Sequence, residues 1–283
     1  MYLADGWQDF AVLDAGGGMK LERWKDVVLL RPDPQAVWPM QEATADAVYI
    51  RSGTGGGHWE FHKALPDSWQ VAYGALRFIV RPTGFKHTGL FPEQAVNWDW
   101  MRDKLEAWKQ QNEGAPRVLN LFAYTGGATL ACAETGASLM HVDAAKGMVN
   151  WAKDNARESG LADAPIRYIV DDCVKLVKRE LRRGSHYEGI VMDPPSYGRG
   201  PTGELWKIEH DLWPLVADCA RLLSDKPAFF LINSYTTGLS ASVLANVLRR
   251  ALPEGHSEAD EIGLPIGDGA LVLPCGASAR WMP

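Results

Sequence analysis

Four polar side chains able to hold a nucleoside or to accept a hydrogen bond follow short apolar runs in this 283-residue chain. They are Asp143, Asp172, Asp193 and Asn233, and each stands at the carboxyl end of a predicted strand. In sheets of parallel strands, ligands bind in the crevice outside the carboxyl ends of those strands. The shared position of these residues therefore predicts one site assembled from distant parts of the sequence.

The stretch 117–143 reads as strand, glycine turn, helix, strand and acid. The unalternated apolar run Val118–Phe122 is typical of a strand buried on both faces, and Thr125-Gly126-Gly127 supplies a tight turn. Asp143 follows about twenty residues later, a spacing that lets a carboxylate reach the ribose of an adenosine lying across the strand ends. The turn departs from Gly-x-Gly-x-x-Gly, which disfavours a dinucleotide site. A glycine turn in an unrelated α/β protein stays an open alternative.

A second candidate centre is Asp193-Pro194-Pro195-Ser196-Tyr197, directly after the predicted strand 187–192. Two successive prolines fix φ twice and remove two backbone donors, so they hold the turn rigidly. Such a turn presents the Asp193 carboxylate and the Pro194 carbonyl as acceptors, with Tyr197 as a stacking plate. The glycine-rich segment 198–203 reads as a flexible closure. A purely structural Asp-Pro-Pro turn is the alternative interpretation.

The elements that must position these residues alternate between strand and helix from Arg117 onward, which predicts a mostly parallel, doubly wound α/β sheet. Two further β-prone runs follow, near 261–264 and 270–274. Residues 1–85 instead show short β-prone runs between turns, and predict a smaller β-rich N-terminal domain with substrate recognition as its candidate role. Its glycine-rich turns at 16–18 and 53–57 read as hairpin loops, and its tryptophans read as core rather than as a base-stacking surface. The second predicted domain is 86–283.

Composition limits the class of protein. The chain is 46% hydrophobic and 23% charged with a net charge of −6, which is ordinary for a globular enzyme and gives no overall basic field for nucleic acid. A contact with RNA would therefore need a local basic patch. The predicted helix 174–183 offers one, although a solvated helix surface is a slightly simpler interpretation. Its cations are Lys175, Lys178, Arg179, Arg182 and Arg183.

The four cysteines are scattered, with no Cys-x-x-Cys pair and no His/Cys cluster. This pattern argues against structural zinc and against a disulfide framework, and it favours a reducing compartment. No apolar run approaches the about 18 residues of a membrane span, and the first residues show no export signal. We therefore predict a cytoplasmic protein with no metal and no membrane segment.

As a set, four motifs resemble those of class I S-adenosylmethionine-dependent methyltransferases: Asn120-Leu-Phe-Ala-Tyr-Thr-Gly-Gly127, Val142-Asp143, Asp171-Asp172 and Asp193-Pro-Pro-Ser-Tyr197. More narrowly, Lys86-His-Thr-Gly-Leu-Phe-Pro-Glu-Gln94 resembles the Lys-Thr-Gly-Phe-x-x-Asp-Gln segment of the bacterial 23S rRNA methyltransferase group that includes cytosine-C5 and guanine-N7 enzymes. The resemblance covers about residues 83–283 and implies a seven-stranded Rossmann-like sheet whose last strand is antiparallel.

The resemblance also implies S-adenosyl-L-methionine as the cofactor and a set of residues around it. Those expected to pass under the methionine part are Phe122, Tyr124, Thr125, Gly126 and Gly127. Asp143 is expected at the ribose, Asp172 at the adenine amino group and the Cys173 amide near the ring. Those expected to close over the cofactor are Thr88, Gly89 and Gln94. Asp193 is expected beside both the cofactor and the methyl acceptor, with Pro194 and Tyr197 on the acceptor.

One departure from the family bears on the chemistry. Cytosine-C5 members carry a nucleophilic cysteine after the fifth strand, because the ring carbon reacts only once a thiolate has added beside it. Here that stretch reads Asn233-Ser-Tyr-Thr-Thr237. The sequence therefore predicts methylation of a nucleobase nitrogen in RNA, with rRNA as the expected substrate. The alternatives are an NAD(P)-dependent oxidoreductase on the same fold and a non-catalytic RNA-binding protein that retains the cofactor pocket. The oligomeric state is not predicted.

Overall fold

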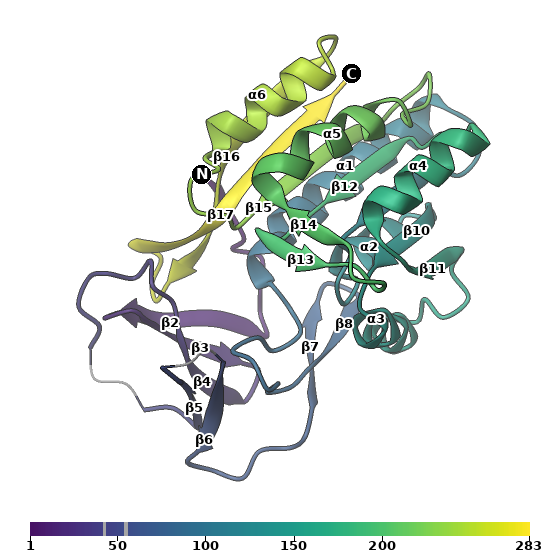
Figure 1. Cartoon of the computed structure of the whole chain (residues 1–283). Helices are drawn as coiled ribbons and strands as arrows, with labels where there is room; N and C mark the ends of the chain where they lie inside the picture. The colour runs from purple at the N-terminus through teal and green to yellow at the C-terminus, as the bar shows by residue number, and fades with distance from the viewer. Residues whose placement is uncertain (42–43, 54–55) are drawn as a thin grey trace. The chain divides into compact units, whose positions relative to one another are not determined.

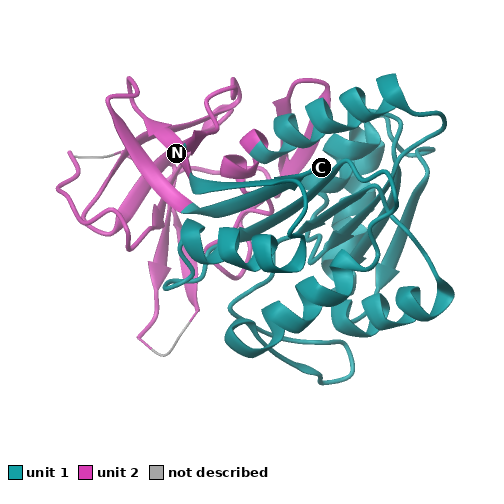
Figure 2. Ribbon diagram, turned by 90° about the horizontal axis from the view of Figure 1, so that it is seen from above, with its two compact units in different colours: residues 1, 97–261, 276–283 teal, residues 2–96, 262–275 magenta. Residues whose placement is uncertain are grey.

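The computed structural model describes residues 1–41, 44–53 and 56–283. The chain divides into two compact units, shown in two colours in Figure 2. Unit 1 contains Met1 and residues 97–261 and 276–283, and unit 2 contains residues 2–96 and 262–275. The β-rich segment expected at 1–85 lies almost wholly in unit 2, which also takes residues 86–96 and part of a C-terminal hairpin. Substrate recognition by this part of the chain stays a prediction.

Unit 1 is built on a sheet in which strands β11, β10, β9, β12 and β15 are neighbours in that order and run parallel. Strand β17 pairs antiparallel with β15, and β16 is the next neighbour of β17. This arrangement confirms the predicted doubly wound, Rossmann-like sheet with an antiparallel last strand. In chain order the strands are β9 (Arg117–Leu121), β10 (Ser138–Asp143), β11 (Ile166–Val170), β12 (Gly189–Met192), β15 (Phe229–Ser234), β16 (His256–Ile266) and β17 (Leu271–Met282).

Helices connect these strands, and Figure 1 shows α4, α5 and α6 side by side on the sheet. Strands β9 and β15 lack alternation because helices cover the sheet: all six residues of β15 and the last four of β9 are buried. One large apolar cluster joins the strands to α4, α5 and α6. The helices are α1 (Ala95–Gln111), α2 (Gly127–Ala133), α3 (Lys146–Glu158), α4 (Cys173–Arg183), α5 (Ile208–Ala220) and α6 (Ala241–Ala251).

Unit 2 contains an array of short strands in the order β2, β3, β4, β5, β6, and a separate β7–β8 hairpin. Trp24 is fully buried, with its ring 4.6 Å from that of Phe10, so the interpretation of this tryptophan as core is confirmed. The turn 16–18 connects β2 to β3 as expected, whereas the turn 53–57 includes residues 54 and 55, which lie outside the described residues. The elements are β1 (Tyr2–Leu3), β2 (Phe10–Gly16), β3 (Met19–Trp24), β4 (Val27–Pro32), β5 (Ala47–Arg51), β6 (Gly57–Phe61), β7 (Trp69–Tyr73), β8 (Leu76–Val80) and the 3₁₀ helix η1 (Pro92–Gln94).

Candidate active site

The register of the parallel strands sets the level at which the candidate acids stand. Val142 of β10 and Met192 of β12 both lie opposite Leu121, the last residue of β9. Asp143 ends β10 and Asp193 directly follows β12, each one residue past that level, and these two strands lie on either side of β9. The two carboxylates therefore flank the turn that leaves β9, at one edge of the sheet.

The turn after β9 has an unusual backbone. Phe122 and Tyr124 have positive φ values of 54° and 50°, and Gly126 has a φ of 89°. A non-glycine residue in this left-handed region costs about 1–3 kcal/mol, and such strain gathers at ligand-binding sites. Gly127 begins α2 directly under Trp98, where a Cβ atom would lie 2.6 Å from the indole ring, so this position admits only glycine without a shift of the ring. At Gly126 and Gly127 the main chain therefore lies at the strand ends without a side chain to cover it.

The Asp143 carboxylate holds this turn in place. It accepts hydrogen bonds from the backbone amides of Tyr124 (2.9 Å) and Ala145 (2.8 Å). Burial raises the pKa of Asp143, while these two amides act in the opposite direction. A partly buried carboxylate that already accepts neutral N–H donors is suited to a neutral hydroxyl partner such as a ribose.

Asp172 and Cys173 stand at the start of α4, next to the same turn. The Asp172 side chain caps the helix by accepting the Lys175 amide at 2.9 Å. The Cys173 sulfur accepts the amide of Phe122 at 3.4 Å, which links α4 to the strained turn. Burial raises the pKa of the Cys173 thiol well above its usual range, so the sulfur stays protonated. The expected contact of Asp172 with an adenine stays a prediction.

The turn after β12 is fixed from two sides. Asp193 accepts a hydrogen bond from the Nδ2 atom of Asn233 at 3.0 Å, and the indole N–H of Trp206 donates to the Pro195 carbonyl at 2.6 Å. Pro194 is buried, whereas Tyr197 is 54% exposed, which leaves this residue accessible for stacking. The role of the Pro194 carbonyl as an acceptor stays a prediction. The motif Asp193–Tyr197 therefore presents one oriented carboxylate beside one exposed ring.

The glycine-rich segment 198–203 lies in a β-hairpin, and its closure over a bound molecule stays a prediction. Strand β13 (Tyr197–Arg199) pairs antiparallel with β14 (Leu205–Lys207). Glu204 accepts the amide of Thr202 and forms an ion pair with Lys175 of α4.

Thr88, Gly89 and Gln94 belong to unit 2, and the closure over the cofactor expected of them stays a prediction. Thr88 is fully buried, and its hydroxyl has no hydrogen-bond partner within the described residues. Gly89 has a φ of 96°, and Gln94 ends η1. Burial, together with nearby Arg31, lowers the pKa of His87 to about 4. The His87 imidazole, in the loop of residues 86–94, is therefore neutral at pH 7.

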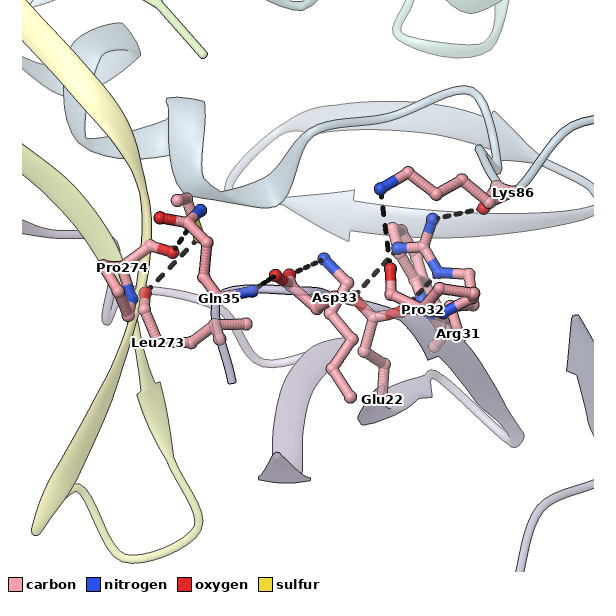
Figure 3. Close-up of polar contacts among 11 residues, drawn as sticks. Glu22, Arg31, Pro32, Asp33, Gln35, Lys86, Leu273 and Pro274 are labelled. Carbon is pink, nitrogen blue, oxygen red and sulfur yellow. Dashed lines mark hydrogen bonds and ion pairs between the residues drawn. The ribbon is translucent and has the colours of Figure 1, made fainter. Parts of the chain in front are cut away.

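A buried ion cluster in unit 2 holds the start of this loop, as Figure 3 shows. Arg31 donates through Nε and Nη2 to both oxygens of Glu22, at 2.6 and 2.9 Å, and through Nη1 to the Lys86 carbonyl at 2.7 Å. Lys20 lies 3.4 Å from Glu22 and 3.3 Å from Asp33. Burial tends to raise the pKa of Glu22, but Arg31 and Lys20 outweigh it and hold that pKa at about 2. Sequence reasoning missed this anchor, whose parts lie on β3, β4 and a distant loop.

The basic helix α4 is less basic than its sequence suggests. Three of its five cations have acidic partners: Lys175 pairs with Glu204, Arg179 with Asp171 and Arg183 with Glu180. Its other two cations, Lys178 and Arg182, are exposed. Contact between this helix and RNA stays a prediction.

Within residues 1–41, 44–53 and 56–283, no group of three or more acidic, His or Cys side chains is arranged to hold a metal ion. In the same part of the chain, no helix is both long and apolar enough to cross a membrane. All four cysteines are buried free thiols. The cytoplasmic location stays a prediction.

Comparison with known proteins agrees with this architecture. The family model of S-adenosylmethionine-dependent methyltransferases matches residues 54–224, more than half of the chain. A crystal structure of an S-adenosylmethionine-dependent methyltransferase from Agrobacterium tumefaciens is 36% identical, with a TM-score of 0.92, and the match covers 99% of this chain and 92% of that one. The chain belongs to the S-adenosylmethionine-dependent methyltransferase family.

Two further known proteins are similar to this chain, one in fold and one over part of its sequence. A putative methyltransferase from Streptococcus mutans shares the fold, with a TM-score of 0.75 at 17% identity over 98% of this chain and 76% of that one. The ribosomal RNA large subunit methyltransferase K/L of Shewanella frigidimarina is 32% identical over 57% of this chain. The match spans only 22% of that longer protein. The family membership therefore sets aside the oxidoreductase alternative, while the substrate is a separate question.

Proposed function

We propose that this protein transfers a methyl group from S-adenosylmethionine to a nitrogen of a nucleobase in RNA, with large-subunit rRNA as the substrate. One observation carries the proposal: Asp143 and Asp193 stand one residue past the same level of the sheet, on either side of the strained turn after β9. This arrangement offers a ribose acceptor on one side of the turn and an acceptor for an N–H group on the other.

The residues around the turn suit the cofactor. Asp143 would hold the ribose, the backbone at Phe122–Gly127 would lie along the methionine part, and Asp172 with the Cys173 amide would meet the adenine. When bound, S-adenosylmethionine supplies an electrophilic methyl group, whose bond to sulfur breaks with its electron pair as the acceptor nitrogen forms the new bond. The protein then has to bind and align the two partners.

Asp193 is the residue that addresses the methyl acceptor. Its carboxylate accepts a hydrogen bond from the acceptor's N–H, which directs the nitrogen lone pair and stabilises the positive charge that develops there. Tyr197, with its ring exposed, stacks on the base. Such a base has to be unpaired or flipped from a helix before it reaches the strand ends.

Nitrogen is favoured over cytosine C5 because all four cysteines are buried free thiols. Methylation at cytosine C5 needs a nucleophilic thiolate. Burial raises the pKa of Cys132 to about 12, and it raises the pKa values of Cys173 and Cys219 well above their usual range. Cys275 is also buried, and its pKa is raised by the same desolvation. The site therefore suits direct transfer of the methyl group to a nitrogen atom.

The proposed RNA substrate is supported by the name of the Shewanella relative, which matches over 57% of this chain. The exposed Lys178 and Arg182 of α4 are candidate phosphate contacts. The matched segment makes up 22% of that relative, and labelled methyl transfer tests the substrate on this chain.

The test uses the full-length protein, tritium-labelled S-adenosylmethionine and large-subunit rRNA from cells that lack this gene. We expect label in the rRNA, at a nitrogen after nucleoside digestion and chromatography. Label at a carbon atom would contradict the nitrogen assignment, and label in tRNA or protein would contradict the rRNA assignment. Calorimetric binding of S-adenosylmethionine without transfer to any cell fraction would favour the non-catalytic RNA-binding alternative.

A further inference from the structure

We propose that a chain of four polar side chains, which we call the Arg280 relay, orients and polarises Asp193 for the methyl acceptor. The relay consists of Arg280, Asn97, Ser278 and Asn233. These residues act on the methyl acceptor only through Asp193, so they are positioning residues. The inference rests on the proposed function of Asp193 and adds residues that neither the motif nor the family match assigns.

The relay joins α1, β15 and β17 to the end of β12 inside unit 1. Arg280 donates to Asn97 Oδ1 through Nη2 at 2.9 Å and through Nε at 3.2 Å. Asn97 Nδ2 donates to Ser278 Oγ at 2.7 Å, and Ser278 Oγ donates to Asn233 Oδ1 at 2.9 Å. Asn233 Nδ2 then donates to Asp193 Oδ1 at 3.0 Å. All four members of the relay are buried, with exposures of 5% or less.

All the bonds in the relay point the same way, and the guanidinium fixes that direction. Arg280 can only donate, so the oxygen of Asn97 faces it and the nitrogen of Asn97 faces Ser278. Ser278 accepts that bond, which directs its single proton to the oxygen of Asn233. The nitrogen of Asn233 is thereby left to face Asp193. A cation at one end thus decides the orientation of an amide three bonds away.

This direction has a consequence for Asp193. Successive hydrogen bonds of the same sense strengthen one another by about 10–30% per bond in a buried setting. Asn233 Nδ2, the last donor of the relay, therefore favours the ionised form of the Asp193 carboxylate and restricts its rotation. An ionised, fixed carboxylate accepts the N–H of the methyl acceptor, whereas an amide turned the wrong way would present an oxygen to Asp193 and repel it.

Two substitutions break the relay in different ways. Ser278→Ala removes the hydroxyl, and leaves Asn97 and Asn233 without their shared partner. Asn97→Asp is nearly isosteric and still pairs with Arg280. Because the new carboxylate can only accept, it draws the Ser278 proton away from Asn233 and reverses the sense of the next bond.

The experiment measures kcat and KM for transfer of labelled methyl groups to large-subunit rRNA, and the calorimetric affinity for S-adenosylmethionine. We expect Ser278→Ala and Asn97→Asp each to lower kcat by roughly tenfold or more, since a hydrogen bond to a charged group is involved. The KM for rRNA and the affinity for S-adenosylmethionine should stay within about twofold. Ser278→Thr keeps the hydroxyl and should recover most of kcat. Ser257→Ala replaces a buried strand serine outside the relay and should leave kcat unchanged.

The outcomes separate the relay from the proposed function. If the wild-type protein transfers no methyl group, the proposed function fails and the relay's role fails with it. If the wild type is active and Asn97→Asp retains its kcat, the relay alone is overturned. The same holds if kcat and cofactor affinity fall and KM rises together with a lower melting temperature, because this is the result of a purely structural role. Should Ser278→Ala fail to fold, the isosteric Asn97→Asp and the conservative Ser278→Thr still decide the matter.

Discussion

Asp143 and Asp193 stand at one level of the sheet, yet different kinds of atoms hold their carboxylates. Asp143 receives two backbone amides, one of them from the turn that it fixes and the other two residues further along the chain. Asp193 receives a side-chain amide, whose orientation depends on Ser278 and, beyond it, on Arg280. The proposed cofactor side is therefore organised by local backbone, and the proposed acceptor side by long-range side-chain contacts.

This difference has a physical reason. A cofactor that is common to a large family can be held by main-chain geometry, which tolerates changes of sequence. Recognition of one acceptor atom needs a carboxylate fixed in rotation, and a buried side-chain network provides that restriction. The predictions below test this contrast, from the largest expected effect to the smallest.

Removal of the acceptor-side carboxylate should have the largest effect. Asp193→Ala should lower methyl transfer by roughly a thousandfold, because the site loses the group that aligns the acceptor and stabilises its developing charge. The affinity for S-adenosylmethionine should stay close to that of the wild type. Labelled transfer and calorimetry measure the two quantities. An equal loss of cofactor affinity in Asp193→Ala and Asp143→Ala would contradict the division into two sides.

Glu22 provides a second long-range case, in unit 2. Glu22→Gln should lower the free energy of unfolding by about 3–5 kcal/mol at pH 7, since it leaves the buried cations Arg31 and Lys20 without their anion. The pKa of Glu22 is about 2 in the folded protein against 4.5 as its ordinary value. Its contribution is therefore fully present above about pH 4.5 and is lost as the pH falls toward 2.

Urea denaturation across this pH range measures both effects. The wild type should lose stability between pH 4.5 and 2 by about 3 kcal/mol more than Glu22→Gln does, from the difference in pKa. Parallel stability curves for the two proteins would show that Glu22 is not ionised in the buried cluster.

Removal of the cofactor-side carboxylate should have an intermediate effect. Asp143→Ala should weaken S-adenosylmethionine binding by roughly ten- to a hundredfold, because a hydrogen-bonding carboxylate and the brace of the strained turn are both lost. Asp143→Asn retains one acceptor oxygen, so its affinity for S-adenosylmethionine should lie between those of the wild type and Asp143→Ala. Calorimetry measures the affinities, and an unchanged affinity in Asp143→Ala would remove this residue from the cofactor site.

The smallest effect concerns the backbone of the turn itself. Tyr124 has a φ of 50°, which costs an L-residue other than glycine about 1–2 kcal/mol. Tyr124→Gly should therefore be more stable than Tyr124→Ala by about 1 kcal/mol, although glycine usually destabilises a folded chain relative to alanine. Urea denaturation of the two variants gives the difference. The reverse order would show that the turn is not strained in solution.

Much of the fold follows from patterns that lie close together in the sequence. The unalternated run Val118–Phe122 predicts a strand buried on both faces, and β9 is that strand. The alternation of strands and helices after Arg117 predicts the parallel sheet, since such connections leave few other arrangements. The acids fall at strand ends in the sequence, and the register then places two of them at one level.

The weaker predictions concern segments whose structure depends on contacts with distant residues. The glycines at 198–203 give no sign of the β13–β14 hairpin or of the Lys175–Glu204 ion pair. The last strands run over His256–Ile266 and Leu271–Met282, well beyond the two short runs expected near 261–264 and 270–274. The end of β17 is rich in small and polar residues, and becomes a buried strand only through its pairing with β15.

The sequence by itself determined the order of strands, the glycine turn and the acids that follow the strands, because these depend on neighbouring residues and on the apolar pattern. Only the tertiary structure decided how Asp193 is held and how Arg31 reaches the Lys86 carbonyl. These contacts join residues that lie far apart in the sequence, and their strength comes from burial, which a local pattern does not record. The same burial keeps the cysteines protonated and thereby directs the proposed chemistry to nitrogen.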